Sequence, residues 1–275
     1  MEYYKGRDNL ACTIFVPFKC GNNCPFCNTK QMYDNFVFSQ EHLDAILDMI
    51  DKVNKSVFVR EYVITGGEPL FNLPVLKTII DRMEKTVFIN TSFPAVKNID
   101  EIIEFINSSD KIEGVSVSRH IGYTHDVHVC DRGTLDRLEK PVRVNTVVTE
   151  NDLDKIVPFV EYWCTPERMA NLRADYRTIT TDNLKSRDKI SQFMLDHFLW
   201  EYTNGCLVCN SEMYSDEYER VVCYHRGLES SCVVAGKRCY VNDVLVDMYG
   251  NMYKDWDMKR DEDFEKWLFQ NIVNR

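Results

Sequence analysis

The stretch CTIFVPFKCGNNCPFC (residues 12–27) places an apolar segment directly before three closely spaced cysteines. Its first seven residues are mainly β-branched or aromatic, which predicts a strand. Cys20, Cys24 and Cys27 follow on the next loop in the pattern C-x3-C-x2-C. A structural zinc site needs four ligands, whereas three thiolates on one loop suit a 4Fe–4S cluster with one iron open to another ligand. A zinc site completed by a distant residue is the alternative that this motif leaves open.

Predicted strands and helices alternate through the first 200 or so residues, which is typical of a parallel sheet covered by helices. The alternation predicts an α/β fold, a partial (β/α)6 TIM-like barrel, over residues 1–203. Residues 204–275 lose this pattern and predict a small Cys-rich C-terminal subdomain with a β-hairpin and a terminal helix. The predicted strands are residues 12–18, 60–65, 86–91, 113–118, 141–148 and 173–177. The first predicted helix begins at Ser39, and the later ones cover residues 74–84, 98–107, 134–140, 151–163 and 189–200.

Composition restricts the class of protein further. The 275 residues are 44% hydrophobic and carry a net charge of −10, which argues against extended nucleic-acid binding. No apolar run approaches the roughly 18 residues of a membrane span, and the first residues do not resemble a signal peptide. We therefore expect a cytoplasmic protein without a membrane partner. Eleven cysteines, an odd number gathered in clusters, then indicate metal or iron–sulfur ligation rather than a disulfide scaffold.

A second motif, ITGGEPL (residues 64–70), ends the second predicted strand. Together with the cysteine loop, in which Phe26 takes the aromatic place before the last cysteine, it resembles the radical SAM superfamily. The resemblance implies a 4Fe–4S cluster on the three cysteines and S-adenosyl-L-methionine as a cofactor contacted by Gly66, Gly67, Glu68 and Pro69. Glycines at this position would let the backbone approach the cofactor closely. Glu68 would accept a hydrogen bond from the cofactor amine or stabilise the loop.

The same resemblance extends to residues at the ends of later strands. It implies cofactor contacts from Thr91, Ser118, Arg119 and Asn145, each of which would otherwise be an ordinary polar residue at a strand end. Residues 119–133 hold three histidines over the predicted barrel mouth and suggest substrate contact. In this segment Cys130 is a candidate catalytic hydrogen-atom donor, with a buried inert thiol as the alternative.

The C-terminal region resembles the SPASM and twitch domains that bind auxiliary clusters. Cys239, Gly250 and Asp255 follow the spacing of that element, except that an aspartate stands where a cysteine is expected. The resemblance implies a second iron–sulfur cluster, and a zinc site or free thiols are the alternatives. Its candidate ligands, which cannot all bind at once, are Cys206, Cys209, Cys223, Cys232, Cys239 and Asp255.

The resemblance implies a radical enzyme that cleaves S-adenosylmethionine reductively and removes hydrogen from a nucleotide-like or other small polar substrate. The alternative is a ribosomal peptide maturase of the SPASM or twitch type. A third hypothesis, from a different class, is a nonenzymatic zinc-binding module. The enzyme hypotheses also imply a flavodoxin- or ferredoxin-type reductant as a partner.

Overall fold

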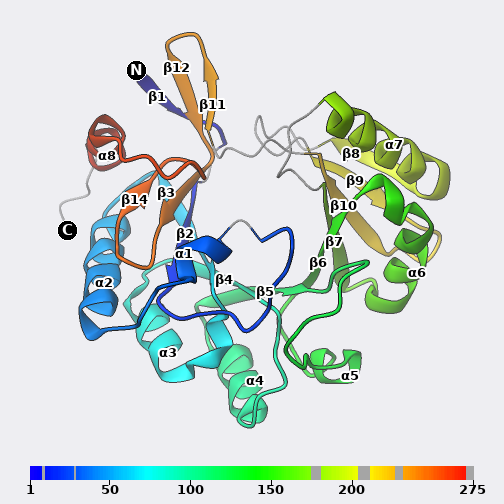
Figure 1. Ribbon diagram of the computed structural model, residues 1–275, viewed down its shortest axis with the longest axis horizontal. Coiled ribbons are helices and arrows are strands. Elements are labelled where there is room, and N and C mark those ends of the chain that lie inside the picture. Colours follow the sequence, from blue (N-terminus) through cyan, green and yellow to red (C-terminus); the bar gives the residue numbers. More distant parts are fainter. Residues whose placement is uncertain (8–9, 28, 175–180, 204–210, 227–231, 271–275) are drawn as a thin grey trace.

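The computed structural model describes residues 1–7, 10–27, 29–174, 181–203, 211–226 and 232–270. Its main feature is a curved eleven-stranded sheet in the order β14-β13-β2-β3-β4-β5-β6-β7-β10-β9-β8 (Figure 1). Five of the predicted strands are present, and the sixth, expected at residues 173–177, begins earlier, at Arg168; residues 175–177 lie outside the described ranges. These six strands lie side by side and parallel at the centre of the sheet. They are β2 (Leu10–Val16), β3 (Val59–Gly66), β4 (Thr86–Thr91), β5 (Ile112–Ser118), β6 (Val142–Val148) and β7 (Arg168–Ala174). This large parallel sheet confirms the predicted α/β class and is consistent with a partial TIM-like barrel.

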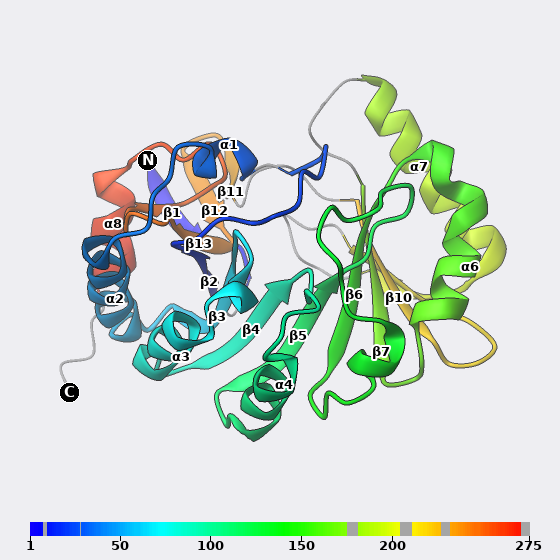
Figure 2. The same ribbon diagram turned by 60° about the horizontal axis from the view of Figure 1, so that its bottom comes forward.

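Helices connect these strands and cover the outer face of the sheet (Figure 2). The helices are α1 (Lys30–Tyr33), α2 (Gln40–Asn54), α3 (Leu73–Arg82), α4 (Ile99–Ser108), α5 (Arg132–Leu135), α6 (Leu153–Trp163) and α7 (Thr181–His197), with short 3-10 turns at Pro69–Phe71 and Glu150–Asp152. In α2 the Oγ of Ser39 accepts a hydrogen bond from the backbone N–H of His42, as an N-cap residue does. The same helix buries Leu43, Ile46 and Ile50 against the sheet. All seven residues of β2 are buried, as expected for a strand covered on both faces.

Five of the strands from residue 199 onward extend both edges of the barrel sheet, an arrangement that the sequence did not predict. At one edge β10 (Val221–His225) pairs parallel with β7, followed by β9 (Ser211–Ser215) and β8 (Leu199–Thr203). At the other edge β13 (Asp243–Val246) pairs parallel with β2, and β14 (Met252–Tyr253) completes the predicted hairpin. The C-terminal region therefore shares its main sheet with the barrel.

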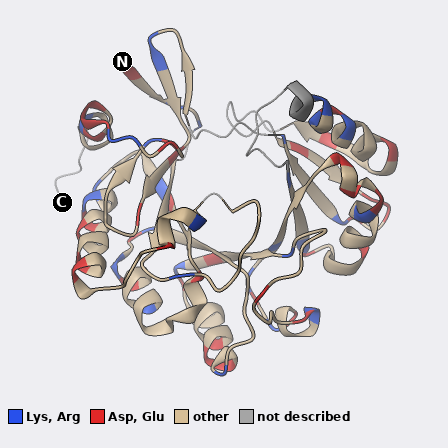
Figure 3. Ribbon diagram, viewed as in Figure 1, with Lys and Arg blue, Asp and Glu red and all other residues tan. Residues whose placement is uncertain are grey.

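A second, three-stranded sheet stands beside the barrel. It joins β1 (Glu2–Lys5) at the start of the chain to the hairpin of β11 (Cys232–Ala235) and β12 (Arg238–Val241). The predicted terminal helix is α8 (Glu262–Phe269). No helix in the described ranges is long and apolar enough to cross a bilayer. Figure 3 shows acidic and basic residues interspersed over the outer elements, so the net charge is not gathered on one of them.

Candidate functional site

A cavity of about 410 Å³ lies at the carboxyl ends of the central strands, where barrels of this kind place their sites. It brings together most of the residues that the sequence singled out. The predicted residues that line it are Cys20, Cys24, Phe26, Cys27, Gly66, Gly67, Glu68, Thr91, Ser118 and Asn145. Pro69, Arg119 and Cys130 do not line it. Two histidines of the 119–133 segment, His120 and His125, also line the cavity.

The cysteine loop supplies its sulfur atoms with hydrogen-bond partners. The backbone N–H and the side-chain Nδ2 of Asn22 lie 3.4 and 3.6 Å from Cys20 Sγ, and Cys27 Sγ lies 3.5 Å from the hydroxyl of Thr29. Burial raises the pKa of the Cys20 thiol and raises that of Cys24 to about 11. Ligation by these residues would therefore release protons. Donors aimed at sulfur and cysteines at the cavity wall fit the predicted cluster.

A loop after β5 holds the cysteine loop in place. Asp126 Oδ2 accepts hydrogen bonds from the Asn23 backbone N–H and the Tyr123 hydroxyl, both at 2.6 Å. The edge of the Phe26 ring packs on His120 with the ring centroids 4.4 Å apart. Burial lowers the pKa of His120 to about 3, so this ring is neutral. The contact of Asp126 was not predicted, because Asn23 is 103 positions away in the sequence.

The two glycines of the second motif are required by the protein itself. A Cβ atom on Gly67 would overlap the carbonyl oxygen of Phe18 and lie 2.9 Å from the carbonyl carbon of Lys19. Gly66 has φ +105°, and a Cβ there would overlap the Tyr33 hydroxyl. The sequence-based reason, close approach to the cofactor, is therefore not needed to explain either glycine. Both let the end of β3 pack against the backbone that leads into the cysteine loop.

Glu68 ties the ends of β3 and β4 together. Its side chain is 1% exposed, and its two carboxylate oxygens accept four hydrogen bonds. The donors are Leu70 N at 3.1 Å, the Thr91 hydroxyl, Ser92 N at 2.7 Å and the Ser92 hydroxyl at 2.5 Å. Burial raises the pKa of the carboxyl, while the hydrogen bonds oppose that shift. Of its two predicted roles, this geometry favours stabilising the loop, since the donors occupy the lone pairs that a cofactor amine would need.

Arg119 and Cys130 do not line the cavity, and the Arg119 side chain contacts the backbone of Cys130. The Arg119 guanidinium donates to the carbonyls of Ser92 (2.6 Å) and Cys130 (2.7 Å), and it stacks 5.2 Å from the Trp163 ring. Burial lowers its pKa to about 10. The Cys130 thiol is buried and lies 3.6 Å from the carbonyl of Pro94. The predicted cofactor contact of Arg119 and catalytic role of Cys130 receive no support from these positions, and the inert-thiol alternative fits better.

The inner face of β6, β7 and β10 carries polar residues that sequence analysis missed. Asn171 Nδ2 donates to Asn145 Oδ1 at 2.9 Å, and His225 Nε2 lies 2.9 Å from Asn171 Oδ1. Burial, together with the smaller effect of the Arg173 and Arg143 guanidinium groups, lowers the pKa of His225 to about 3. Arg173 lines the cavity. The alternation of residues along β6 and β7 was the signal that would have placed these side chains on the same face as Asn145.

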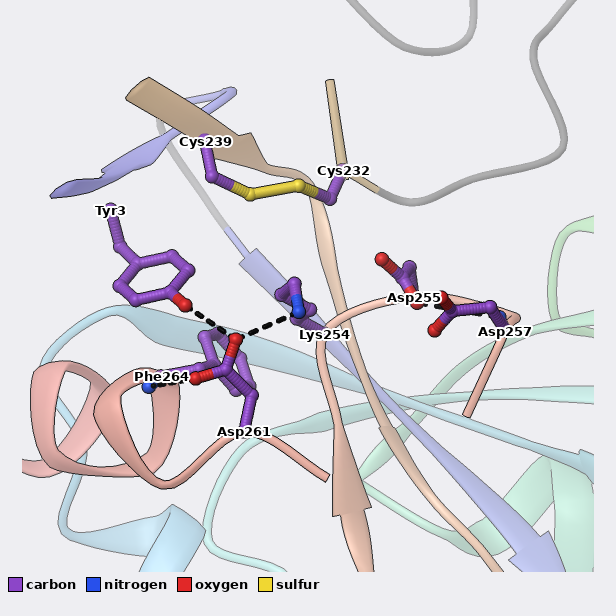
Figure 4. The surroundings of a disulfide bond; sticks show 8 residues. All are labelled: Tyr3, Cys232, Cys239, Lys254, Asp255, Asp257, Asp261 and Phe264. Carbon is purple, nitrogen blue, oxygen red and sulfur yellow. Dashed lines mark hydrogen bonds and ion pairs between the residues drawn. A yellow bond between two sulfur atoms is a disulfide. The ribbon is translucent and has the colours of Figure 1, made fainter. Parts of the chain in front are cut away.

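The candidate auxiliary-cluster ligands are dispersed. Cys206 and Cys209 lie outside the described residues, and Cys223 is buried on β10, 3.4 Å from His225 Nε2. Cys232 and Cys239 are joined by a disulfide bond, a pairing that the sequence did not predict (Figure 4). Across the described ranges, no three His, Cys, Asp or Glu side chains are already gathered in the geometry of a metal site, and this includes Cys20, Cys24 and Cys27, which share a loop and a cavity wall.

Asp255, the remaining candidate, pairs with Asp257 near the disulfide (Figure 4). Burial is the main reason that its pKa rises to about 6, and the neighbouring Asp257 raises it further. Beside this pair, Asp261 Oδ2 accepts from the Tyr3 hydroxyl at 2.5 Å and from Lys254 Nζ at 2.8 Å. The Tyr3–Asp261 hydrogen bond links β1 to the start of α8.

Known protein families and solved structures resemble parts of this chain. Residues 6–118 match the family described as a 4Fe-4S single cluster domain. The fold resembles the crystal structure of Streptococcus suis SuiB, with 12% identity and a TM-score of 0.61 over 97% of this chain and 66% of that chain. The structure of SuiB bound to S-adenosylmethionine has 11% identity and a TM-score of 0.60, over 94% of this chain and 65% of that chain. The structure of SuiB bound to precursor peptide SuiA has 16% identity and a TM-score of 0.49, over 68% of this chain and 46% of that chain. No curated protein sequence matches the chain.

The family match covers the cysteine loop and the glycine motif, and the shared fold is that of SuiB. These findings agree with the class that the motifs predicted: residues 6–118 resemble a 4Fe-4S single cluster domain, and the chain has the fold of SuiB. It spans about two thirds of the length of the SuiB chains that it resembles.

Proposed function

We propose that this enzyme binds a 4Fe–4S cluster through Cys20, Cys24 and Cys27, cleaves S-adenosylmethionine reductively, and uses the 5′-deoxyadenosyl radical to remove hydrogen from a peptide. One observation carries the proposal. The three cysteines and the glycine-rich end of β3 line the same cavity at the carboxyl ends of a parallel sheet.

The cavity residues fit the two cofactors. A reduced cluster would supply the single electron that breaks the sulfonium C–S bond of S-adenosylmethionine. Asn22 would stabilise the Cys20 thiolate through its two donors to sulfur. Glu68 would keep the end of β4 at the distance that the cofactor requires, and the Phe26–His120 contact would shield the cavity from water.

A peptide substrate has more support than the nucleotide-like substrate that the sequence favoured. SuiB, whose fold the chain shares, has been crystallised with the precursor peptide SuiA, and no finding points to a nucleotide. The alternative from the sequence, a peptide maturase, is therefore our main proposal. A small polar substrate takes second place.

An auxiliary cluster and an electron donor belong to the same proposal. The auxiliary cluster would draw ligands from the tail cysteines and Asp255, which requires the Cys232–Cys239 disulfide to be reduced first. A flavodoxin- or ferredoxin-type protein would deliver electrons in the cytoplasm.

The experiment is an anaerobic incubation of reconstituted enzyme with reductant, S-adenosylmethionine and short peptides encoded beside its gene. We expect mass spectrometry to find a peptide altered by loss of hydrogen or by a new bond, and peptide-dependent growth in 5′-deoxyadenosine. Product from a nucleotide pool but from no peptide would contradict the peptide substrate. Absence of 5′-deoxyadenosine under every condition would contradict the whole proposal.

A further inference from the structure

The cavity contains a cationic side chain that the proposed chemistry does not use. Arg173 lines the cavity from the carboxyl end of β7, and its side chain is exposed. None of the ion pairs within the described ranges involves it. A guanidinium that lines a cavity without an internal carboxylate is available for an anionic ligand.

Asn145 lies beside Arg173 on the same face of the sheet. Asn145 pairs with Asn171 and Val147 pairs with Arg173 in the parallel register of β6 and β7, so Asn145 and Arg173 lie on one face, one step apart. Both line the cavity. Two neighbouring strands thus present polar groups to the same space.

Hydrogen bonds behind Asn145 determine which end of its amide faces the cavity. Asn171 Oδ1 can only accept, so His225 Nε2 donates to it, and the Ser211 hydroxyl lies 2.7 Å from His225 Nδ1 on the other side of the ring. Asn171 Nδ2 in turn donates to Asn145 Oδ1. The oxygen of Asn145 is therefore turned toward Asn171, and its N–H₂ group is left for a ligand. This orientation makes Asn145 a donor, like Arg173.

The acidic residues of the cavity do not compete for these donors. Both carboxylate oxygens of Glu68 already accept hydrogen bonds from Leu70, Thr91 and Ser92. Asp34, the other acidic lining residue, belongs to the C-cap of α1 beside the cysteine loop rather than to the sheet.

We propose that Arg173 and Asn145 form a subsite for a carboxylate group, with Asn171 and His225 as the positioning residues that orient the Asn145 amide. The inference rests on the proposed function, because the carboxylate would belong to an acidic side chain of the peptide substrate. A guanidinium and an amide N–H₂ offer donors to the two carboxylate oxygens.

Binding measurements without reductant test the subsite, so that no radical chemistry is needed. The probes are N-acetyl-glutamate N-methylamide and its glutamine counterpart, and S-adenosylmethionine and 5′-deoxyadenosine, which lacks a carboxylate. Wild-type protein, reconstituted anaerobically, is compared with Arg173→Gln, Asn145→Asp and Asn171→Leu. Arg143→Gln is the matched control, because Arg143 points to the same inner face and stacks 4.8 Å from the Phe88 ring, but does not line the cavity.

For a substrate carboxylate we expect wild type to bind the glutamate probe about tenfold more tightly than the glutamine probe, as one charge-assisted contact provides. Arg173→Gln should abolish the preference, Asn145→Asp should reverse it, and Arg143→Gln should keep it. Asn171→Leu should reduce the preference, whereas a merely structural role would weaken both probes alike.

If Arg173→Gln instead weakens the binding of S-adenosylmethionine about tenfold, leaves 5′-deoxyadenosine unchanged and keeps the glutamate preference, Arg173 holds the cofactor carboxylate and the substrate subsite is refuted. If Arg173→Gln changes neither the glutamate preference nor the binding of S-adenosylmethionine, the subsite is refuted. A subsite that binds carboxylate in a protein that never cleaves S-adenosylmethionine would contradict the proposed function and not this inference.

Discussion

Replacing Gly67 with Ala should disturb the cysteine loop, because the new methyl group has no room. The added Cβ would overlap the Phe18 carbonyl oxygen and lie 2.8 Å from the Phe18 carbonyl carbon, and these atoms belong to backbone that cannot rotate away. Overpacking of this kind costs about 3 kcal/mol. In a chain of this size that corresponds to a fall in Tm of about 6–12 °C. The displaced segment leads directly into Cys20, so the cluster loop should move with it.

The assay measures Tm and bound iron after anaerobic reconstitution. We expect Gly67→Ala to lose about as much iron as Cys24→Ala does. Gly133→Ala is the control, because its Cβ would meet nothing closer than Asp131 Oδ1 at 3.7 Å. Close approach to the cofactor, the reason that the sequence suggested for this glycine, would instead give weaker binding of S-adenosylmethionine with iron near normal. That pattern in Gly67→Ala would refute the packing argument.

Three further predictions follow from buried or strained groups. Glu68→Gln places an amide N–H₂ against two hydrogen-bond donors and should lower the free energy of unfolding by about 3 kcal/mol, measured by chemical denaturation. The control Glu61→Gln loses a half-exposed ion pair with Arg7 and should lower it by less than about 1 kcal/mol. Equal losses in the two variants would contradict the role of the four donors to Glu68. Asp255 has its pKa raised to about 6, so it contributes stability below its unfolded pKa of about 4 that is lost as the pH rises through 6. In metal-free protein Asp255→Asn should therefore raise the free energy of unfolding by about 1 kcal/mol at pH 8, after allowance for partial exposure of the carboxyl, and leave it unchanged at pH 4. An increase in the free energy of unfolding at pH 4 alone would show that folding lowers the pKa of Asp255 and would contradict the prediction. Cys239→Ala should lower iron by one cluster's amount while barrel binding of S-adenosylmethionine persists, and unchanged iron would exclude Cys239 as an auxiliary ligand.

The sequence was sufficient for the barrel strands and the cysteine loop. Apolar runs such as residues 12–18 become strands wherever both faces are buried, and all seven residues of β2 are buried. The cysteine spacing and the glycine motif are local patterns, so they needed no tertiary information. Both line one cavity.

The direction of Arg119 could have been predicted and was not. Residues alternate between the two faces of a strand, so a cavity-lining Ser118 turns its neighbour Arg119 away from the cavity. The same rule applied from Asn171 places Arg173 on the inner face.

Other features depend on contacts between distant parts of the chain. The attachment of β10 and β13 to opposite edges of the barrel depends on pairing over long sequence distances, which no local pattern encodes. A glycine looks the same in the sequence whether a ligand or neighbouring backbone excludes its side chain, so the contact between Gly67 and Phe18 appears only in three dimensions.

The central claim is that Cys20, Cys24 and Cys27 hold a cluster that cleaves S-adenosylmethionine. The most direct measurement is the rate of 5′-deoxyadenosine formation by anaerobically reconstituted, reduced protein, compared with the Cys24→Ala variant. Our account predicts formation of 5′-deoxyadenosine and methionine by wild type and none by the variant, because two thiolates are too few to hold the cluster. Cys164→Ala, which removes a buried thiol outside the cavity, should retain cleavage. Equal rates in wild type and Cys24→Ala, or zinc in place of iron in active wild-type protein, would contradict the account.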